Sequence, residues 1–339
     1  MKEVYRKKTG NMEQLAYVRR VVYEEGLAGG LHAFQVKNGP LYFTAGLDKC
    51  LDIAELSWRG NQISFLSKPG LQGRQHYDTN GFEAQKSIMG GLFFTCGTNN
   101  VGTPSVDPEA PLSMHGTMRS TAAEHVCADA HWEDGEYVLE IGGQMRQAQL
   151  FGENIVLRRK IRTVYGQSRI RIHDEFENQG FRPEPFMLLY HFNIGYPMLD
   201  AGAEVQIPSV KACLRGEETE TELPWKEVSE PVNRKPEEVF FHTMHADSDG
   251  KVRVRVQNQE LRTAFTLVYD PVQLPNFAQW KSMASGDYVL GLEPCNCHVN
   301  GQKWEREQGN LAVLAPGERK EVDLEIVLED LPAEQKPLD

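Results

Sequence analysis

The chain lacks long apolar runs and is short of positive charge. No segment reaches the roughly 18 consecutive apolar residues that a membrane-spanning helix needs, so we expect no membrane partner. Lys and Arg number 36 against 48 Asp and Glu, which gives a formal net charge of -12. Nucleic acids and anionic membranes bind basic patches, so this balance argues against both as partners. A neutral small molecule such as a carbohydrate stays possible.

Cysteine is also scarce, with six residues in a chain of 339. This density is far too low for a disulfide scaffold and favours a cytoplasmic protein. Cys295 and Cys297 form an isolated C-x-C with no second pair at zinc-ligand spacing, so packing is favoured over a metal site. The first 15 residues are basic but have no apolar core, and we do not expect them to be a secretory signal.

Helical periodicity is almost absent, and strand patterns follow one another instead. Residues 31–37 and 41–45 flank the turn cluster Asn38-Gly39-Pro40, and residues 123–132 and 136–145 flank Asp134-Gly135, a pair typical of tight hairpin turns. At 169–172 Ile alternates with Arg, which indicates a strand with one face in the core and one in water.

Many strands and few helices predict an all-β protein, a large antiparallel β-sandwich with few short helices. We expect a single domain over 1–339, with a core of about 30–328 after an N-terminal extension of about 30 residues. The acidic, proline-bearing residues 214–237 are interpreted as a long surface loop.

Glu293 is the first candidate for chemistry. It follows the apolar segment 288–292 and precedes Pro294, so we expect it at the end of a buried strand. Burying an ionised carboxylate costs several kcal/mol unless the group is hydrogen-bonded or used. The local sequence leaves a catalytic acid and a solvent-exposed strand end equally open.

Two histidines and a tryptophan are further candidates. His191 lies in the apolar run 187–199 near its expected end, where partial burial would tune a proton donor, although a core histidine is the alternative. His115 precedes Gly116 on a predicted loop, facing either a cleft or solvent. Trp280 would either stack on a sugar or pack in the core.

The glycine-rich residues 90–104 lack the Lys and Ser/Thr of a phosphate-binding loop, and their spacing is not that of a dinucleotide-binding motif. Glycines in this stretch would instead let the backbone approach a ligand closely, or form bulges.

Together these stretches resemble the aldose 1-epimerase (galactose mutarotase-like) superfamily, and within it an uncharacterised epimerase-like branch. The resemblance rests on the H-G-x-x-R of 115–119, the Tyr-His-x-Asn of 190–193 and the Gly-Leu-Glu-Pro of 291–294, in the family's order along the chain. It extends over roughly 30–328.

The resemblance implies a large antiparallel β-sandwich that interconverts the anomers of a free sugar without a metal or cofactor. It implies Glu293 as the general base and His191 as the general acid. The substrate-binding residues would be the following: His115, Arg119, Arg74, Trp280 and Asn193.

Three departures from the family leave the sugar open, and one is the absence of the arginine of its early Asn-Arg motif, for which Arg74 could serve. In this chain Phe-Asn-Ile-Gly-Tyr follows the second histidine, in place of the family's Pro-Tyr-Phe-Asn-Leu, and the family's substrate-binding Asp has no match. The alternatives are another sugar-modifying enzyme, such as a lyase or isomerase on an oxidised or modified sugar, and a non-catalytic carbohydrate-binding protein. The sequence leaves the oligomeric state open.

Overall fold

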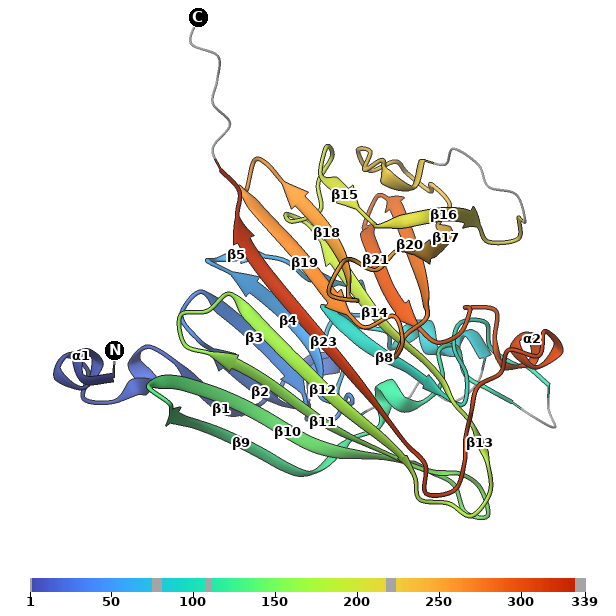
Figure 1. The fold of residues 1–339 in the computed structure, drawn as a ribbon, viewed down its shortest axis with the longest axis horizontal. Coiled ribbons are helices and arrows are strands. Elements are labelled where there is room, and N and C mark those ends of the chain that lie inside the picture. The colour runs from blue at the N-terminus through green and yellow to red at the C-terminus, as the bar shows by residue number, and fades with distance from the viewer. Residues whose placement is uncertain (1, 75–80, 108–110, 218–223, 333–339) are drawn as a thin grey trace, which may run out of the picture.

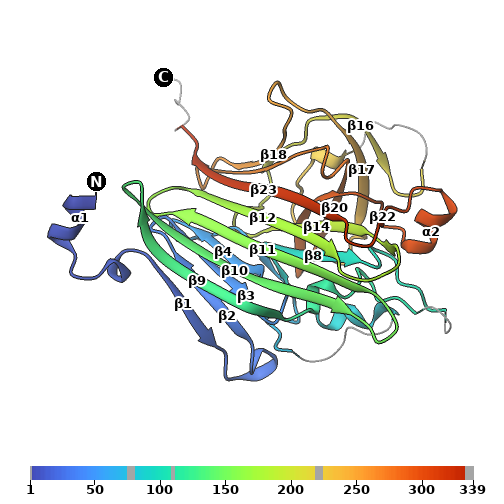
Figure 2. The same cartoon turned by 60° about the horizontal axis from the view of Figure 1, so that its bottom comes forward.

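Antiparallel sheets make up most of the computed structural model, which describes residues 2–74, 81–107, 111–217 and 224–332 (Figure 1). A five-stranded, an eight-stranded and a six-stranded sheet are accompanied by two short strand pairs. The predicted all-β sandwich with few short helices is confirmed. In Figures 1 and 2 the two α-helices lie at opposite ends of the molecule, away from the sheets.

In the two larger sheets the spatial order of the strands differs from their order along the chain. In spatial order, the five-stranded sheet contains β1 (Tyr17–Val22), β2 (His32–Lys37), β3 (Leu41–Gly46), β4 (Asp52–Trp58) and β5 (Asn61–Gln62). The eight-stranded sheet contains β15 (Glu204–Gln206), β18 (Val252–Asn258), β19 (Thr263–Tyr269), β23 (Arg319–Asp330), β12 (Arg169–Asn178), β11 (Asn154–Val164), β10 (Glu136–Ala148) and β9 (Ala123–Glu133). The six-stranded sheet contains β16 (Ser209–Leu214), β17 (Glu238–Met244), β20 (Asn276–Ala284), β21 (Asp287–Cys295), β14 (Met187–Gly195) and β8 (Phe93–Thr98).

The remaining elements are short. The two strand pairs are β6 (Phe65–Leu66) with β7 (Gly90–Gly91), and β13 (Glu184–Pro185) with β22 (Val313–Leu314). The α-helices of the described chain are α1 (Lys2–Lys8) and α2 (Gln302–Glu307), and its 3-10 helices are Met12–Gln14, Gly26–Ala28, Gly81–Lys86, Met118–Ser120 and Pro224–Lys226.

Local sequence accounts for the hairpins. Asp134 and Gly135 both have positive φ, 49° and 83°, as a primed turn requires, and they join β9 to β10 as predicted. On β12, Ile170 and Ile172 are buried in the core, whereas Arg171 on the other face pairs with Glu325 of β23. The alternation seen in the sequence therefore marks the two faces of this sheet.

Two further predicted segments can be followed in the structure. Within the residues predicted as an N-terminal extension, β1 pairs with β2 as the edge of the five-stranded sheet. Part of the predicted loop 214–237 lies outside the described residues, since 218–223 are not described, and the rest includes the 3-10 helix Pro224–Lys226.

The six-stranded sheet is apolar on both faces. On β14, Leu188, Tyr190 and Phe192 belong to the large core, whereas Met187 and Leu189 belong to a second, smaller cluster on the opposite face. A strand covered on both sides appears as a continuous apolar run in the sequence, as 187–192 does.

A buried ionic network joins the three sheets beneath this strand. Arg159 of β11 bonds to Asp174 of β12 at 2.6 and 2.8 Å and to Asp52 of β4 at 2.5 Å. Thr95 of β8 also binds Asp52, and the Tyr190 hydroxyl donates to Asp174 at 2.6 Å. Buried charges are tolerated when they are paired and hydrogen-bonded in this way, so the network fixes β8 and β14 relative to each other.

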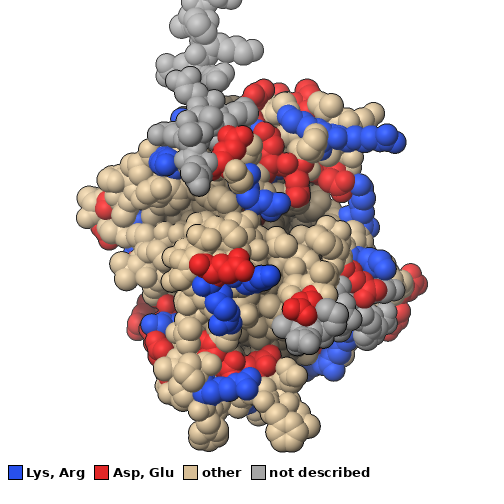
Figure 3. Space-filling model, turned by 90° about the vertical axis from the view of Figure 1, so that its right-hand side faces the viewer, with Lys and Arg blue, Asp and Glu red and all other residues tan. Residues whose placement is uncertain are grey.

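Charged side chains are scattered over the outside of the molecule (Figure 3). On the face in Figure 3 positive and negative side chains are interspersed, so the net charge of -12 is not gathered into one patch there.

Candidate active site

A row of side chains crosses the six-stranded sheet on the face opposite the large core. The strand register aligns Cys213 with Phe241, Phe241 with Ala278 and Ala278 with Glu293. The pairs that flank Glu293 on β21 place it opposite His191 of β14, and His191 pairs with Phe94 of β8. Side chains opposite each other in this way are in contact range.

His191 and Glu293 form the centre of this row. Nε2 of His191 lies 3.1 Å from Oε1 of Glu293, and their residues are 6% and 2% exposed. The distance is that of an ion pair, but the angle does not make a hydrogen bond. Oε1 of Glu293 therefore has no hydrogen-bond partner among the described residues. Nδ1 of His191, on the other side of the ring, has none there either. Buried polar atoms are nearly always satisfied, so an unsatisfied atom on each residue of this pair indicates a site for a ligand.

Burial sets the protonation of this pair. It raises the pKa of Glu293 to about 8, with a further contribution from the charge of Glu237. Burial also lowers the pKa of His191 to about 3, which the side chain of Asn193 only partly offsets. At neutral pH Glu293 is therefore protonated and His191 is a neutral imidazole. Transfer of the Glu293 proton to His191 produces a carboxylate beside an imidazolium.

The sequence suggested that Glu293 lies at the end of a strand, but it lies inside β21. The strand continues to Cys295 through Pro294, which pairs with Phe277 of β20. A proline has no N–H for a strand ladder. The pairs between β21 and β14 skip 293 and 294, so the missing donor falls where that ladder is interrupted.

Gly291 makes room for the carboxylate. A Cβ at this position would lie 2.7 Å from Oε1 of Glu293 and 2.9 Å from Cβ of Trp280. Both distances are too short for real contacts, so the Gly-Leu-Glu motif needs its glycine.

His115 reaches the pair from a loop. Its backbone has φ of 60°, and it is held by hydrogen bonds between its N–H and Gly102 O at 3.1 Å and between Gly97 N–H and its own carbonyl at 3.0 Å. The Gly102 N–H also donates to Nδ1 of His115 at 3.3 Å. This bond assigns the proton of the neutral ring to Nε2, which makes the ring a donor.

His115 stays neutral in this position. Its ring lies 5.5 Å from that of His191. Burial, and then electrostatic interaction with His191 and Arg119, hold the pKa of His115 well below its usual value.

The glycine-rich stretch explains how this loop fits. Cβ atoms would lie 2.1 Å from Met187 O at Gly97, 1.9 Å from Val299 O at Gly102 and 2.4 Å from Gly97 O at Gly116. The glycines thus let the backbone of this loop approach neighbouring backbone closely, whereas from the sequence we expected it to approach a ligand or to form bulges. Asn100 then joins two loops, because its amide donates to Ser113 O at 2.9 Å and its carbonyl accepts from Gln302 N at 2.8 Å.

Aromatic rings enclose the His191 imidazole. Phe94 stacks on it with centroids 4.5 Å apart and an angle of 18°, and Trp280 meets it edge-on at 5.4 Å. The half-buried Trp280 donates from Nε1 to Glu237 at 2.8 Å. Trp280 therefore both packs in the cluster and borders the pair.

Glu237 is the residue that sequence reasoning missed. It immediately precedes β17 and is exposed, and its charge contributes to the raised pKa of Glu293. No motif marks it. The only signal in the sequence was its position in the acidic pair Glu237-Glu238, which precedes the apolar residues 239–241.

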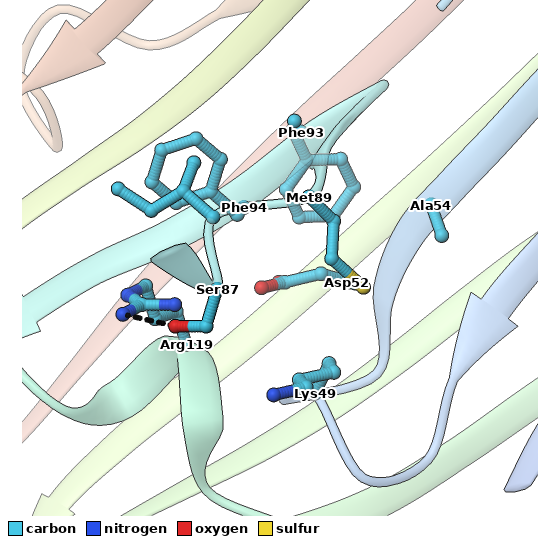
Figure 4. A pocket seen from close by; sticks show the side chains of 10 residues that line it. Lys49, Asp52, Ala54, Ser87, Met89, Phe93, Phe94 and Arg119 are labelled. Carbon is cyan, nitrogen blue, oxygen red and sulfur yellow. Dashed lines mark hydrogen bonds between the residues drawn. The ribbon is translucent and has the colours of Figure 1, made fainter. Parts of the chain in front are cut away.

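Arg119 lies behind Phe94 and outside the row. It is 4% exposed, and its Nη2 donates to Ser87 Oγ at 3.3 Å. With Lys49 and Asp52 it lines a cavity of about 20 Å³, roughly the size of one water molecule (Figure 4). Its charge reaches His115 from this position.

Asn193 and Arg74 have other partners. Asn193 donates to the carbonyl of its neighbour His191 at 2.8 Å and to Gly91 O at 3.3 Å, which fixes the strand backbone. Arg74, whose side chain is 64% exposed, binds Asp48 at 2.5 Å. None of the described contacts joins Arg74 to the central pair.

Cys295 and Cys297 are buried in the apolar cluster on this face. Within the described ranges no group of three or more His, Cys, Asp or Glu side chains is placed to hold a metal ion.

Solved structures with this fold include sugar-related proteins. A protein of Klebsiella pneumoniae subsp. pneumoniae MGH 78578 described as a "putative aldose 1-epimerase" matches with a TM-score of 0.84 and 20% identity, over 92% of this chain and 83% of its own. A galactose mutarotase-like protein of Clostridium acetobutylicum matches with a TM-score of 0.65 and 12% identity, over 94% of this chain and 100% of its own. The galactose 1-epimerase of Lactobacillus acidophilus NCFM matches with a TM-score of 0.62 and 11% identity, over 94% of this chain and 100% of its own.

These likenesses establish a galactose mutarotase-like β-sandwich fold, and at 20% identity or less they establish the fold alone. None of the curated proteins compared with this chain is similar to it in sequence. A family model matches residues 28–328, and the chain therefore belongs to the family described as "Domain of unknown function (DUF4432)".

Proposed function

We propose that this protein is a carbohydrate-active enzyme of the aldose 1-epimerase type, which interconverts the anomers of a free sugar. The observation that carries the proposal is the buried His191–Glu293 pair, which has unpaired polar atoms and lies on the face of the six-stranded sheet opposite the large core. The names of the similar structures support a small sugar as the ligand.

The reaction needs only the proton that the pair already holds. As the sugar binds, the proton moves from Glu293 to His191. The Glu293 carboxylate then takes the proton of the C1 hydroxyl while His191 protonates the ring oxygen, and the C1–O5 bond breaks to give the open aldehyde. Rotation about C1–C2 and the reverse transfers give the other anomer. Each positioned group contributes roughly a hundred- to ten-thousand-fold to such a rate.

The surrounding residues have separate roles in this proposal. The neutral His115 donates from Nε2 to a sugar oxygen, and Trp280 presents an aromatic face to the ring. Glu237, beside Trp280, accepts from a sugar hydroxyl in place of the missing family Asp. Asn193 and Arg119 act by positioning His191 and His115. A substrate-binding role for Arg74 rests on the resemblance alone.

Anomer exchange measured by saturation-transfer NMR over a panel of aldoses tests the proposal. Glu293→Gln keeps the shape of the side chain and removes the base, so we expect exchange to fall at least about a hundredfold. Glu321→Gln, on an exposed position of β23, is the matched control and should leave exchange unchanged. Equal exchange in the wild type and Glu293→Gln would overturn the proposal.

Product analysis and binding measurements on the same variants separate the alternatives. A lyase on an oxidised sugar gives an unsaturated product that absorbs ultraviolet light, and an isomerase gives a chemically different sugar. A protein that only binds gives neither, and Glu293→Gln then changes affinity alone.

We also propose a cytoplasmic location. Its support is that all six cysteines are free thiols. Among the described residues no helix is long and apolar enough to span a membrane.

A further inference from the structure

The row of side chains that carries Glu293 continues into a second pocket. A cavity of about 280 Å³ lies over β16, β17 and β20, and two of its lining residues, Cys213 and Phe241, are members of the row. Phe241 lies two strands from Glu293, with the small Ala278 between them. At 4.7–4.9 Å per strand the separation is about 10 Å, which a second sugar ring linked to the first can span.

His298 closes one side of this pocket and is held in a fixed orientation. Its ring meets Phe241 edge-on at 5.1 Å and Trp304 at 5.0 Å. Glu305 of α2, 0% exposed, lies 3.1 Å from Nδ1 and accepts from the His298 backbone N–H at 2.5 Å. The carboxylate accepts a hydrogen bond from Nδ1–H, so in this tautomer Nε2 is the acceptor.

The remaining lining suits a polar, anionic ligand. Asn276 and Thr243 offer an amide and a hydroxyl beside the aromatic ring of Phe241. Lys211 is a cation at the exposed side, and no described carboxylate lines the cavity. An aromatic ring surrounded by hydrogen-bonding groups is typical of sugar sites, and the lysine adds a preference for negative charge.

We propose that this pocket is a subsite for a second sugar unit that carries an acidic group, so that the preferred substrate is a reducing disaccharide with a uronic acid at its far end. The inference rests on the proposed function for what occurs at the first ring. The inference itself concerns only the binding of the second ring.

Cys213 provides a test that does not need activity. In the described chain Cys127 is exposed, Cys213 is half-buried and the other four cysteines are buried. In a Cys127→Ser background the rate of alkylation by iodoacetamide therefore reports on the pocket. We expect an acidic reducing disaccharide to slow labelling of Cys213 at least about fivefold, a neutral disaccharide to slow it less, and the matching monosaccharide to leave it unchanged.

Two variants test which residues of the pocket are responsible for the protection of Cys213. Phe241→Ala should raise the disaccharide concentration needed for protection about tenfold, and Lys211→Gln should do so for the acidic disaccharide only. Lys320→Gln on β23 is the control and should change nothing. Protection that is absent, or equal for the monosaccharide, overturns the inference even if anomer exchange occurs. Protection without anomer exchange keeps the subsite and overturns the proposed function.

Discussion

His191 and Glu293 approach to 3.1 Å on adjacent strands, and yet each keeps a buried atom without a hydrogen-bond partner among the described residues. Such an arrangement costs stability, because unsatisfied buried polar atoms are expensive. The surrounding fold offsets this cost, and several measurable properties follow from it.

The rate should depend on pH through the single proton of the pair. Burial raises the pKa of Glu293 to about 8 and lowers that of His191 to about 3, so the pair keeps one proton between these values. Above about 8 it loses this proton and with it the acid. We expect kcat/KM for anomer exchange, corrected for the uncatalysed rate, to be flat from pH 5 to 7 and to fall towards tenfold per pH unit above 8. A rate that keeps rising above pH 8 contradicts this assignment.

Glu293→Gln should stabilise the protein at alkaline pH. The folded-state pKa is raised from 4.5 to about 8, so the folded state keeps a proton that the unfolded chain releases, and stability falls as the pH rises between these values. The amide does not titrate and avoids this loss. We expect a gain of roughly 3 to 5 kcal/mol at pH 9 and almost none at pH 4.5, from urea unfolding. Glu321→Gln should show no such pH dependence. A gain of equal size at both pH values would rule out this origin.

Gly291→Ala should reduce activity and stability together. The new Cβ would meet Oε1 of Glu293 at 2.7 Å and Cβ of Trp280 at 2.9 Å, so the carboxylate or the indole must move. Overpacking of this kind costs about 1–3 kcal/mol, and we expect kcat to fall at least about tenfold. Gly10→Ala, where a Cβ meets nothing within 4 Å, is the control for a harmless methyl group. Normal kcat in Gly291→Ala would show that the carboxylate does not need this space.

Arg159→Met should be strongly destabilising. It leaves the carboxylates of Asp52 and Asp174 buried without their cation, which costs about 3–5 kcal/mol in the free energy of unfolding. Adding Asp52→Asn should recover part of the loss. Arg162→Met on the same strand removes a partly exposed pair with Glu133 and should cost less than about 1 kcal/mol. Equal losses for the two arginines would mean that the buried network contributes little.

Local features of the sequence predicted local structure well. Asp134-Gly135 fixed a hairpin because its turn needs two positive φ values, and the Ile–Arg alternation at 169–172 identified the two faces of β12. His115, His191 and Glu293 were found because they match motifs in a known order. That order gave no distance between them, and their roles remain predictions.

The rest depends on strand register, which no single segment contains. Glu237 joins the site only because Val239 pairs with Trp280, and Arg159 meets Asp52 from a strand 107 residues away. Glu293 was expected at a strand end because a proline follows it. The interruption of the ladder to β14 that lets Pro294 stay inside the strand is a property of the assembled sheet. The extent of the domain likewise remains a prediction.

Asn100 links the loop that holds His115 to the segment that follows His298, through one amide. This amide ties the backbone two residues before His115 to the backbone four residues after His298. Replacing Asn100 would therefore leave the Ser113 carbonyl and the Gln302 N–H on the two loops without this shared partner.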